Sequence, residues 1–129
     1  MDDLLFRMMA EDQAFCEEIL RVILSDPGLT VLECTPQYDV TNLQGRSATF
    51  DAHCVLSCGK QAIIEVQKAD DDNHQKRMRY NGALLTTNIT DPGESFQNVP
   101  NVCAVLISRF DIFDGGLPLY HVDRVIREN

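Results

Sequence analysis

The segment from Val102 to Ser108 most constrains the fold of this chain. It reads Val-Cys-Ala-Val-Leu-Ile-Ser and is almost continuously apolar. A strand with one solvated face alternates apolar and polar residues, whereas a continuous apolar run suits a strand that helices cover on both faces. We therefore expect a layered α/β domain in which this strand is buried in a sheet.

Helical patterns flank the expected sheet region. Asp2 to Met9 has enough apolar residues for about two helical turns. Asp12 supplies an N-cap for a second helix that continues to Ile23 and is stopped by Ser25-Asp26-Pro27-Gly28. A third helix is predicted from about His74 to Thr87, and Asp91-Pro92-Gly93 ends that region.

Four further segments have strand character. They are Leu29 to Tyr38, Ala48 to Leu56, the short apolar run Ala62 to Ile64, and Leu119 to Val122 near the end of the chain. A turn at Cys58-Gly59-Lys60 can join the second and third of these into a hairpin. The resulting order of helix, three strands, helix and two strands predicts a mixed central sheet.

Length and charge narrow the possible functions. The 129 residues, 44% of them hydrophobic, predict a single domain over residues 1–129 with one core. The net charge of −9 argues against a protein that holds nucleic acid by overall electrostatics, so any DNA contact has to be local or metal-assisted. Neither a signal peptide nor a membrane span is visible, and a cytoplasmic protein is the default expectation.

The five cysteines form no recognisable framework. Their number is odd and no Cys-x-x-Cys pair occurs, which disfavours both a disulfide scaffold and a structural zinc site. We expect reduced, mostly buried thiols that behave as small hydrophobes. If the strand is regular, Cys54 and Cys58 share the face opposite Asp51 and belong to the core.

Polar residues on the two hairpin strands point to a metal site. Side chains alternate along a strand, so Glu65 and Gln67 share a face, as do Asp51 and His53 on the partner. If Ser57 pairs with Gln61, Asp51 lies opposite Gln67 and His53 opposite Glu65. A two-residue loop would shift the register by one and reverse the faces. The plainer alternative is that both acids are exposed on a solvated hairpin and that His53 is a surface residue.

Several segments, in this order, resemble one family: Asp2-Asp3-Leu4-Leu5-Phe6, Phe50-Asp51, Ile64-Glu65-Val66-Gln67, Lys76-Arg77-Met78-Arg79-Tyr80 and Phe110-Asp111-Ile112-Phe113. The chain resembles the PD-(D/E)XK nuclease family transposases, relatives of the recombination-promoting nucleases, along nearly its whole length. The resemblance implies a restriction-endonuclease-like αβββαβ core and a metal-dependent DNA endonuclease.

The resemblance also assigns roles to residues. Asp51 corresponds to the first acidic residue of the family motif, Glu65 to the second, and Gln67 to the glutamine that this group has where many relatives have lysine. Asp2 or Asp3 matches the acidic pair that opens the motif. Two departures stand out: the chain ends earlier than family members commonly do, and the lysine is absent, which puts catalytic efficiency in question.

Hard oxygen ligands at such a site suit Mg²⁺ or Mn²⁺. Asp51, Glu65 and the backbone carbonyl of Val66 are the expected ligands. Glutamine cannot ionise, so Gln67 can only orient a water by hydrogen bonds. A cation from the following helix has to replace the missing lysine, and Lys76 or Arg79 is the expected one.

Basic and aromatic residues after the hairpin are candidates for contacts with DNA: Lys68, Lys76, Arg77, Arg79 and Tyr80. The competing expectations are that the arginines pair with Asp70, Asp71 and Asp72 and that Tyr80 is a packing residue. Glu17 could lend a further acid to the metal, but a solvated helix face is the more common role. The alternative function is a nuclease-fold domain without catalysis that binds DNA or a protein partner, and a homodimer is compatible with either function.

Overall fold

The computed structural model describes residues 11–41, 45, 47–67 and 73–128. The expected helix from Asp2 to Met9 lies outside these residues, as do Lys68 and the three aspartates that follow Ala69. Within them, the chain forms a small α/β domain with a mixed sheet of four strands and two α-helices, in the predicted order α-β-β-β-α-β.

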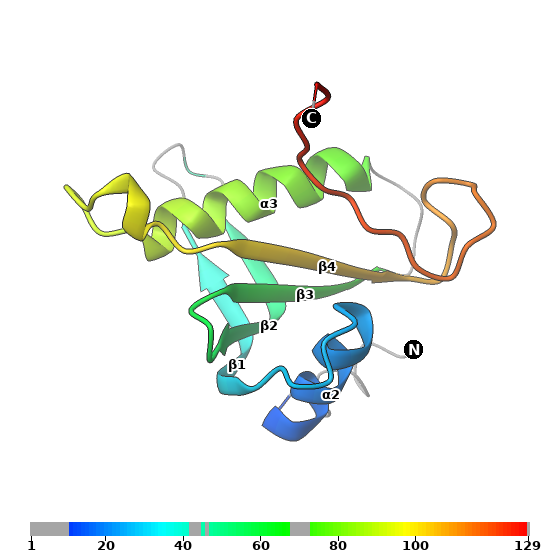
Figure 1. Cartoon of the computed structure of the whole chain (residues 1–129), viewed down its shortest axis with the longest axis horizontal. Coiled ribbons are helices and arrows are strands. Elements are labelled where there is room, and N and C mark those ends of the chain that lie inside the picture. The colour runs from blue at the N-terminus through cyan, green and yellow to red at the C-terminus, as the bar shows by residue number, and fades with distance from the viewer. Residues whose placement is uncertain (1–10, 42–44, 46, 68–72, 129) are drawn as a thin grey trace.

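The four strands follow one another across the sheet in chain order (Figure 1). Strands β1 (Val31–Val40), β2 (Ala48–Leu56) and β3 (Gln61–Gln67) pair antiparallel, and β4 (Val102–Ser108) runs parallel to β3. The parallel pair needs a crossover, which contains helix α3 (His74–Ile89). The mixed sheet expected from the sequence is therefore confirmed, and β3 extends through Gln67.

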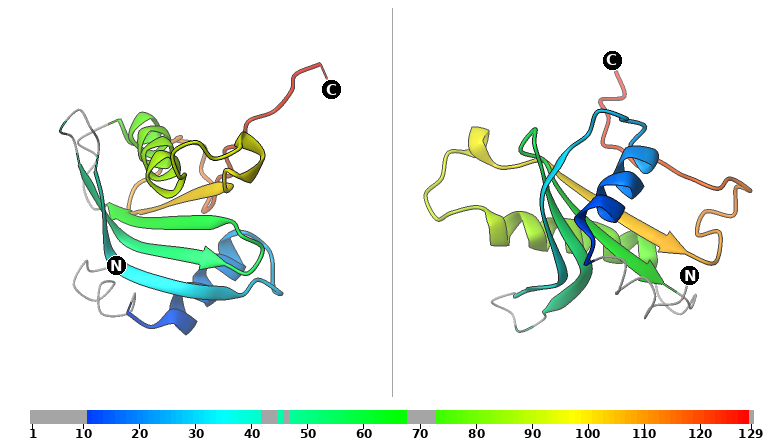
Figure 2. Two further views of the ribbon diagram at one scale, coloured as in Figure 1. Left: turned by 90° about the vertical axis from the view of Figure 1, so that its left-hand side faces the viewer. Right: turned by 90° about the horizontal axis from the view of Figure 1, so that it is seen from below.

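The two helices lie on opposite faces of the sheet (Figures 1 and 2). Helix α2 (Gln13–Ile23) begins at Asp12, whose carboxylate accepts a hydrogen bond from the Ala14 N–H at 2.9 Å, as an N-cap should. Its apolar face packs on the side of the sheet formed by Ala52, Ile64 and their neighbours. Helix α3 covers the other side.

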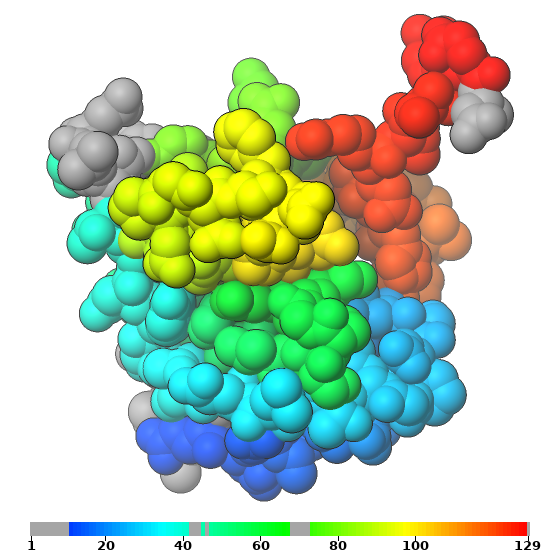
Figure 3. Space-filling view, turned by 60° about the vertical axis from the view of Figure 1, so that its left-hand side comes forward, coloured from blue at the N-terminus to red at the C-terminus, as the bar shows by residue number. Residues whose placement is uncertain are grey.

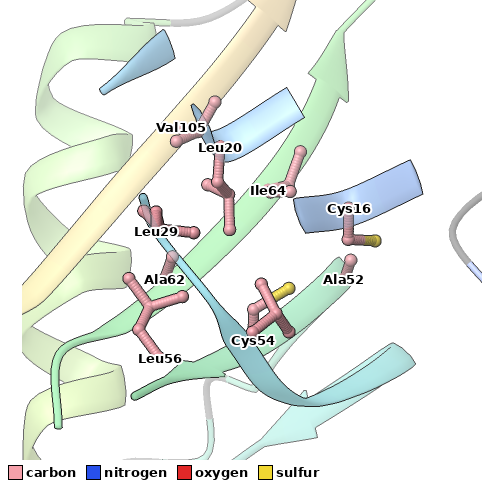
Figure 4. Packing of buried hydrophobic residues seen from close by; sticks show 10 residues of the cluster. Cys16, Leu20, Leu29, Ala52, Cys54, Leu56, Ala62, Ile64 and Val105 are labelled. Atoms are coloured by element: carbon pink, nitrogen blue, oxygen red, sulfur yellow. The ribbon is translucent and has the colours of Figure 1, made fainter. Parts of the chain in front are cut away.

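Each face of the sheet has its own apolar cluster. The α2 side buries Leu20, Leu56 and Ile64 among others, and Figure 4 shows these side chains converging between helix and sheet. The α3 side is smaller and includes Phe50 and Leu85, both completely buried. The apolar burial on both sides explains why the central strands are so hydrophobic.

The side-chain alternation of β2 is reset at Asp51. Residues two apart on a regular strand share a face, yet Phe50 packs with α3 whereas Ala52 packs with α2. The neighbouring strand is also irregular at this level, because Gln37 has a φ of 51°. Asp51 thus lies between two residues that face opposite sides, at the point where the alternation of β2 breaks.

The hairpin register differs from the predicted one by two residues. His53 pairs with Ile63 and Ala52 with Ile64, because Leu56 bonds to Lys60 around a loop that is three residues long. An even shift preserves the faces of the strand, so Glu65 and Gln67 remain on the α3 side. His53 is buried rather than on the surface: its Nε2 lies 2.6 Å from Oε1 of Gln61, and its ring stacks on Tyr38.

Two further expectations are corrected. Leu119 to Val122 is not a strand: it makes no backbone pairing with the free edge of β4, and three of its four residues are exposed. Cys58 is exposed because it lies in the turn beyond the last paired residues of the hairpin. A short 3-10 helix, η1 (Phe96–Asn98), precedes β4. None of the helices in the described residues has the length and apolar character needed to cross a bilayer.

Candidate active site

Glu65 is a buried carboxylate held by helix α3. Its side chain is only 6% exposed, as is usual for a residue on a central strand such as β3. Oε1 lies 3.2 Å from Nη2 of Arg77, and Oε2 accepts a hydrogen bond from Nδ2 of Asn81 at 3.0 Å. Burial of an ionised carboxylate is costly unless it is paired and hydrogen-bonded, and these two partners meet that requirement.

Arg77 connects Glu65 to Gln67. In the amide orientation that satisfies both groups, the Gln67 side-chain oxygen accepts from Nη1 of Arg77 at 3.1 Å and also from Nη2. The guanidinium therefore bridges the two polar residues of β3 that share the α3 face. The cation of this site is Arg77 and not Lys76 or Arg79, which are exposed on α3.

The spacing of residues along α3 could have identified Arg77 from the sequence. Arg77, Asn81 and Leu84 are spaced by four and three residues, so they lie on one face of α3. Leu84 is buried against the sheet. Because the apolar residue fixes which face points inward, Arg77 and Asn81 had to point inward too.

The side chain of Asp51 contacts the backbone of β3. Its Oδ2 accepts a hydrogen bond from the Val66 N–H at 2.8 Å, which is an ordinary length for such a bond. The backbone pairing of β2 with β3 runs from Val55–Gln61 to Ala52–Ile64. The hydrogen bond from Val66 to the Asp51 side chain therefore lies just beyond the last backbone pair of the two strands. Asp51 and Glu65 thus lie on adjacent strands at the same end of the hairpin.

The carboxylate and carbonyl oxygens at this end of the hairpin are of the type that a hard cation binds. The N–H and C=O of one strand residue project toward the same neighbour, so the Val66 carbonyl also faces the Asp51 side. Two carboxylates and one carbonyl are an oxygen set of the kind that Mg²⁺ or Mn²⁺ takes. The contacts of Arg77 and Asn81 with the two Glu65 oxygens oppose a second cation there.

The remaining predicted residues are distributed over both faces. Tyr80 is 37% exposed on α3, beside the exposed Arg79. Glu17 lies on α2, where it pairs with Arg21 at 2.8 Å and accepts from the Val31 N–H at 2.9 Å. Glu17 therefore fastens α2 to the start of β1, on the other side of the sheet from Glu65.

The closing Phe110-Asp111-Ile112-Phe113 motif has a local structural role. Asp111 accepts hydrogen bonds from the Phe113 and Gly116 N–H groups at 3.2 and 2.8 Å and from the Tyr120 hydroxyl at 2.9 Å. The Tyr120 ring also packs on Phe113. The motif orders the loop that follows β4.

Two hollows of the surface lie away from this site. A shallow one of about 370 Å³ is lined by Cys58, Gly59 and Lys60 from the hairpin turn and by Asn98 to Asn101. Figure 3 shows this end, where the yellow segment after α3 lies beside the green turn between β2 and β3. The turn is the opposite end of the hairpin from Asp51, so this hollow is not part of the candidate site.

The sequence reasoning missed a cluster of three cysteines. The Sγ atoms of Cys16, Cys34 and Cys54 lie within 4.8 Å of one another. The thiols of Cys16 and Cys54 both lower the pKa of Cys34, to about 4, whereas the contact with Cys34 raises the pKa of Cys16 to about 12. The same contacts and burial raise the pKa of Cys54. The expectation of reduced, mostly buried thiols holds for Cys16 and Cys54, but it did not include the meeting of these two with Cys34.

Comparison with protein-family models, curated proteins and solved structures found no match for this chain.

Proposed function

We propose that this chain is a metal-dependent DNA endonuclease domain of the PD-(D/E)XK transposase group, with Asp51, Glu65 and Gln67 as its site residues. The observation that carries the proposal is the placement of two carboxylates at one end of the β2–β3 hairpin: Asp51 on the Val66 N–H, and the buried Glu65 on the Arg77 guanidinium. The αβββαβ order and the parallel β3–β4 pair agree with the restriction-endonuclease-like core that the sequence resemblance implies.

Each side chain of the site has a distinct task in phosphodiester hydrolysis. Asp51 and Glu65 would hold Mg²⁺ or Mn²⁺, which would supply an activated water and neutralise charge in the transition state. Asp51 directs one oxygen to the Val66 N–H, which orients the carboxylate and leaves its other oxygen to serve as a ligand. Gln67 orients the water by hydrogen bonding, because an amide cannot take up its proton.

Arg77 is suited to exchange partners when DNA binds. Its side chain is 31% exposed, whereas the Glu65 side chain is 6% exposed, so the guanidinium can turn outward while the carboxylate stays in place. A phosphate accepts two parallel hydrogen bonds from a guanidinium as readily as a carboxylate does. Transfer of Arg77 to a DNA phosphate releases Oε1 of Glu65 for the metal.

One observation favours a second candidate, a nuclease-fold domain that binds DNA or a protein partner without cleaving. Both oxygens of Glu65 already have protein partners, so the buried acid is satisfied without a cation. In this alternative the Glu65–Arg77–Asn81 network only holds α3 on the sheet. The net charge of −9 also predicts weak, salt-sensitive DNA binding.

Plasmid nicking distinguishes the two candidates. Purified wild type is incubated with supercoiled plasmid and Mg²⁺ or Mn²⁺, beside Asp51→Asn and Glu65→Gln. Asp51→Asn keeps an oxygen for the Val66 N–H, so a loss of activity reports on the charge rather than on the fold. Glu33→Gln is the matched control, because Glu33 is an exposed acid on β1.

The expected result is nicking by wild type and Glu33→Gln and a loss on the order of 100-fold or more in both site variants, as for other groups that stabilise developing charge. Equal nicking by all four proteins would exclude these residues as the source of activity. Absence of both nicking and calorimetric metal binding in wild type would support the second candidate, whereas metal binding that Asp51→Asn abolishes would contradict a purely structural role for the site.

A further inference from the structure

The three clustered cysteines come from three different elements of the fold. Cys16 lies on α2, and Cys34 and Cys54 are paired neighbours on β1 and β2. Sγ of Cys34 is 3.1 Å from Sγ of Cys16 and 3.5 Å from Sγ of Cys54, and no disulfide joins them. A disulfide engages two sulfurs, so the convergence of a third from a separate helix calls for another explanation.

The spacing of the sulfurs is close to that of a thiolate metal site. With metal–sulfur bonds of about 2.3 Å, sulfurs around a tetrahedral zinc ion are about 3.8 Å apart. The two Sγ–Sγ separations of 3.1 and 3.5 Å need to widen by less than about 1 Å to reach that value. Rotation about the cysteine χ1 angles can supply such a change without moving the backbone.

The surroundings favour a thiolate at one of the three positions. Contacts with the other two thiols lower the pKa of Cys34, whereas the pKa values of Cys16 and Cys54 are raised, so these two thiols lose their protons only on binding a metal. Cys16 and Cys54 are fully buried among apolar side chains such as Leu20, as Figure 4 shows for these three residues. Cys34 is half-buried on the edge strand β1, so solvent reaches the cluster from that side.

Charge selects the kind of ion. Three thiolates with a monovalent ion leave a net charge of −2 in an apolar region, whereas a divalent ion leaves −1. Because buried charge is costly, the divalent ion is the better match, and sulfur ligands select thiophilic ions over Mg²⁺. Within the part of the chain that the structure describes, the cluster contains no fourth His, Cys, Asp or Glu, so these three sulfurs are the protein ligands that the proposal assigns.

We propose that Cys16, Cys34 and Cys54 form a three-thiolate binding site for a thiophilic divalent cation such as Zn²⁺. The site is separate from the Asp51–Glu65 site, because Cys16 belongs to the helix on the other face of the sheet. Binding ties α2 to β1 and β2. Protons that leave the thiols on binding pass to solvent at the Cys34 side.

Zinc titration of the reduced full-length chain tests the proposal. Affinity is measured by competition with a chromophoric chelator, and metal content after desalting by mass spectrometry. Cys34→Ala is the test variant, since Cys34 is the least buried of the three. Cys103→Ala is the matched control: Cys103 packs against the same apolar cluster but is not one of the three, and burial raises its thiol pKa.

Wild type and Cys103→Ala should bind one Zn²⁺ per chain, and Cys34→Ala should bind it on the order of 100-fold more weakly or worse, since even outer-shell losses cost 10- to 100-fold. Absence of zinc binding by reduced wild type, or equal affinity in Cys34→Ala, would overturn the proposal. A Cys16–Cys34 disulfide that forms in air in a protein that binds no zinc would identify a redox pair instead.

Co²⁺ spectroscopy covers the case in which Cys34→Ala does not fold. Wild type loaded with Co²⁺ should show intense sulfur-to-cobalt charge-transfer absorption in the near ultraviolet, and Zn²⁺ should displace it. Weak absorption typical of oxygen ligands alone would contradict a thiolate site.

Discussion

Replacing Arg77 by methionine would leave the Glu65 carboxylate 6% exposed and without its cation. At the observed 3.2 Å and an effective dielectric constant of 20, the attraction between the two charges is about 5 kcal/mol before desolvation is subtracted. Removal of one partner from a fully buried pair costs about 3–5 kcal/mol. Arg77 is partly exposed and Asn81 still donates to Glu65, so we expect a loss of about 2–3 kcal/mol in the free energy of unfolding.

Urea denaturation of four proteins measures this energy as a cycle: wild type, Arg77→Met, Glu65→Gln and the double variant. The double variant should be more stable than the two single losses added together predict, with a coupling energy of about 1–3 kcal/mol. Arg79→Met is the control, because Arg79 is exposed on the same helix and its loss should change stability by less than about 0.5 kcal/mol. A coupling energy below about 0.5 kcal/mol would refute the buried pair.

The same variant bears on metal binding. In the proposed endonuclease, Arg77 and the metal compete for Glu65, so Arg77→Met should bind Mg²⁺ more tightly than wild type in calorimetry. Weaker binding would indicate that Arg77 helps to build the site instead of competing with the metal.

Three further predictions concern the core, a helix cap and a thiol. Leu20→Ala should lower the free energy of unfolding by about 2–5 kcal/mol, because Leu20 is fully buried. Val22→Ala, at a position 66% exposed on the same helix, should cost less than about 0.5 kcal/mol. Equal losses in chemical denaturation would contradict the packing of α2. Asp12→Ala should cost about 1 kcal/mol and Asp12→Ser much less, and equal midpoints for all three proteins would argue against the cap. Cys34 has a pKa lowered to about 4, so the rate of its alkylation in the metal-free protein should be independent of pH from about pH 5 to 8. Peptide mass spectrometry follows this rate. A tenfold rise in the rate per pH unit, as for an ordinary thiol, would contradict the lowered pKa.

The elements that the sequence predicted well are those set by local signals. Ala48 to Leu56 and Val102 to Ser108 are strands with the predicted bounds, because β-branched and apolar residues fill them and turn residues flank them. Helix α2 ends at Ile23 as expected. Leu119 to Val122 has strand composition but no partner, and pairing between distant segments is not encoded in local composition.

The positions of the proposed site residues could be predicted in part. Alternation correctly placed Glu65 and Gln67 on one face, since β3 is regular. It does not describe β2 around Asp51, where Phe50 and Ala52 face opposite sides of the sheet. The cysteine cluster could not be predicted, because it joins three elements whose packing is known only from the fold.

The bond between Asp51 and the Val66 N–H has a consequence for how copies of this domain would diverge. The carboxylate completes the end of the sheet whether or not any reaction takes place there. Selection for folding alone would therefore retain an oxygen acceptor at position 51 in a descendant that had lost catalysis. Asn at this position would be tolerated in an inactive descendant and not in an active one, so the choice between Asp and Asn distinguishes retained chemistry from inherited architecture.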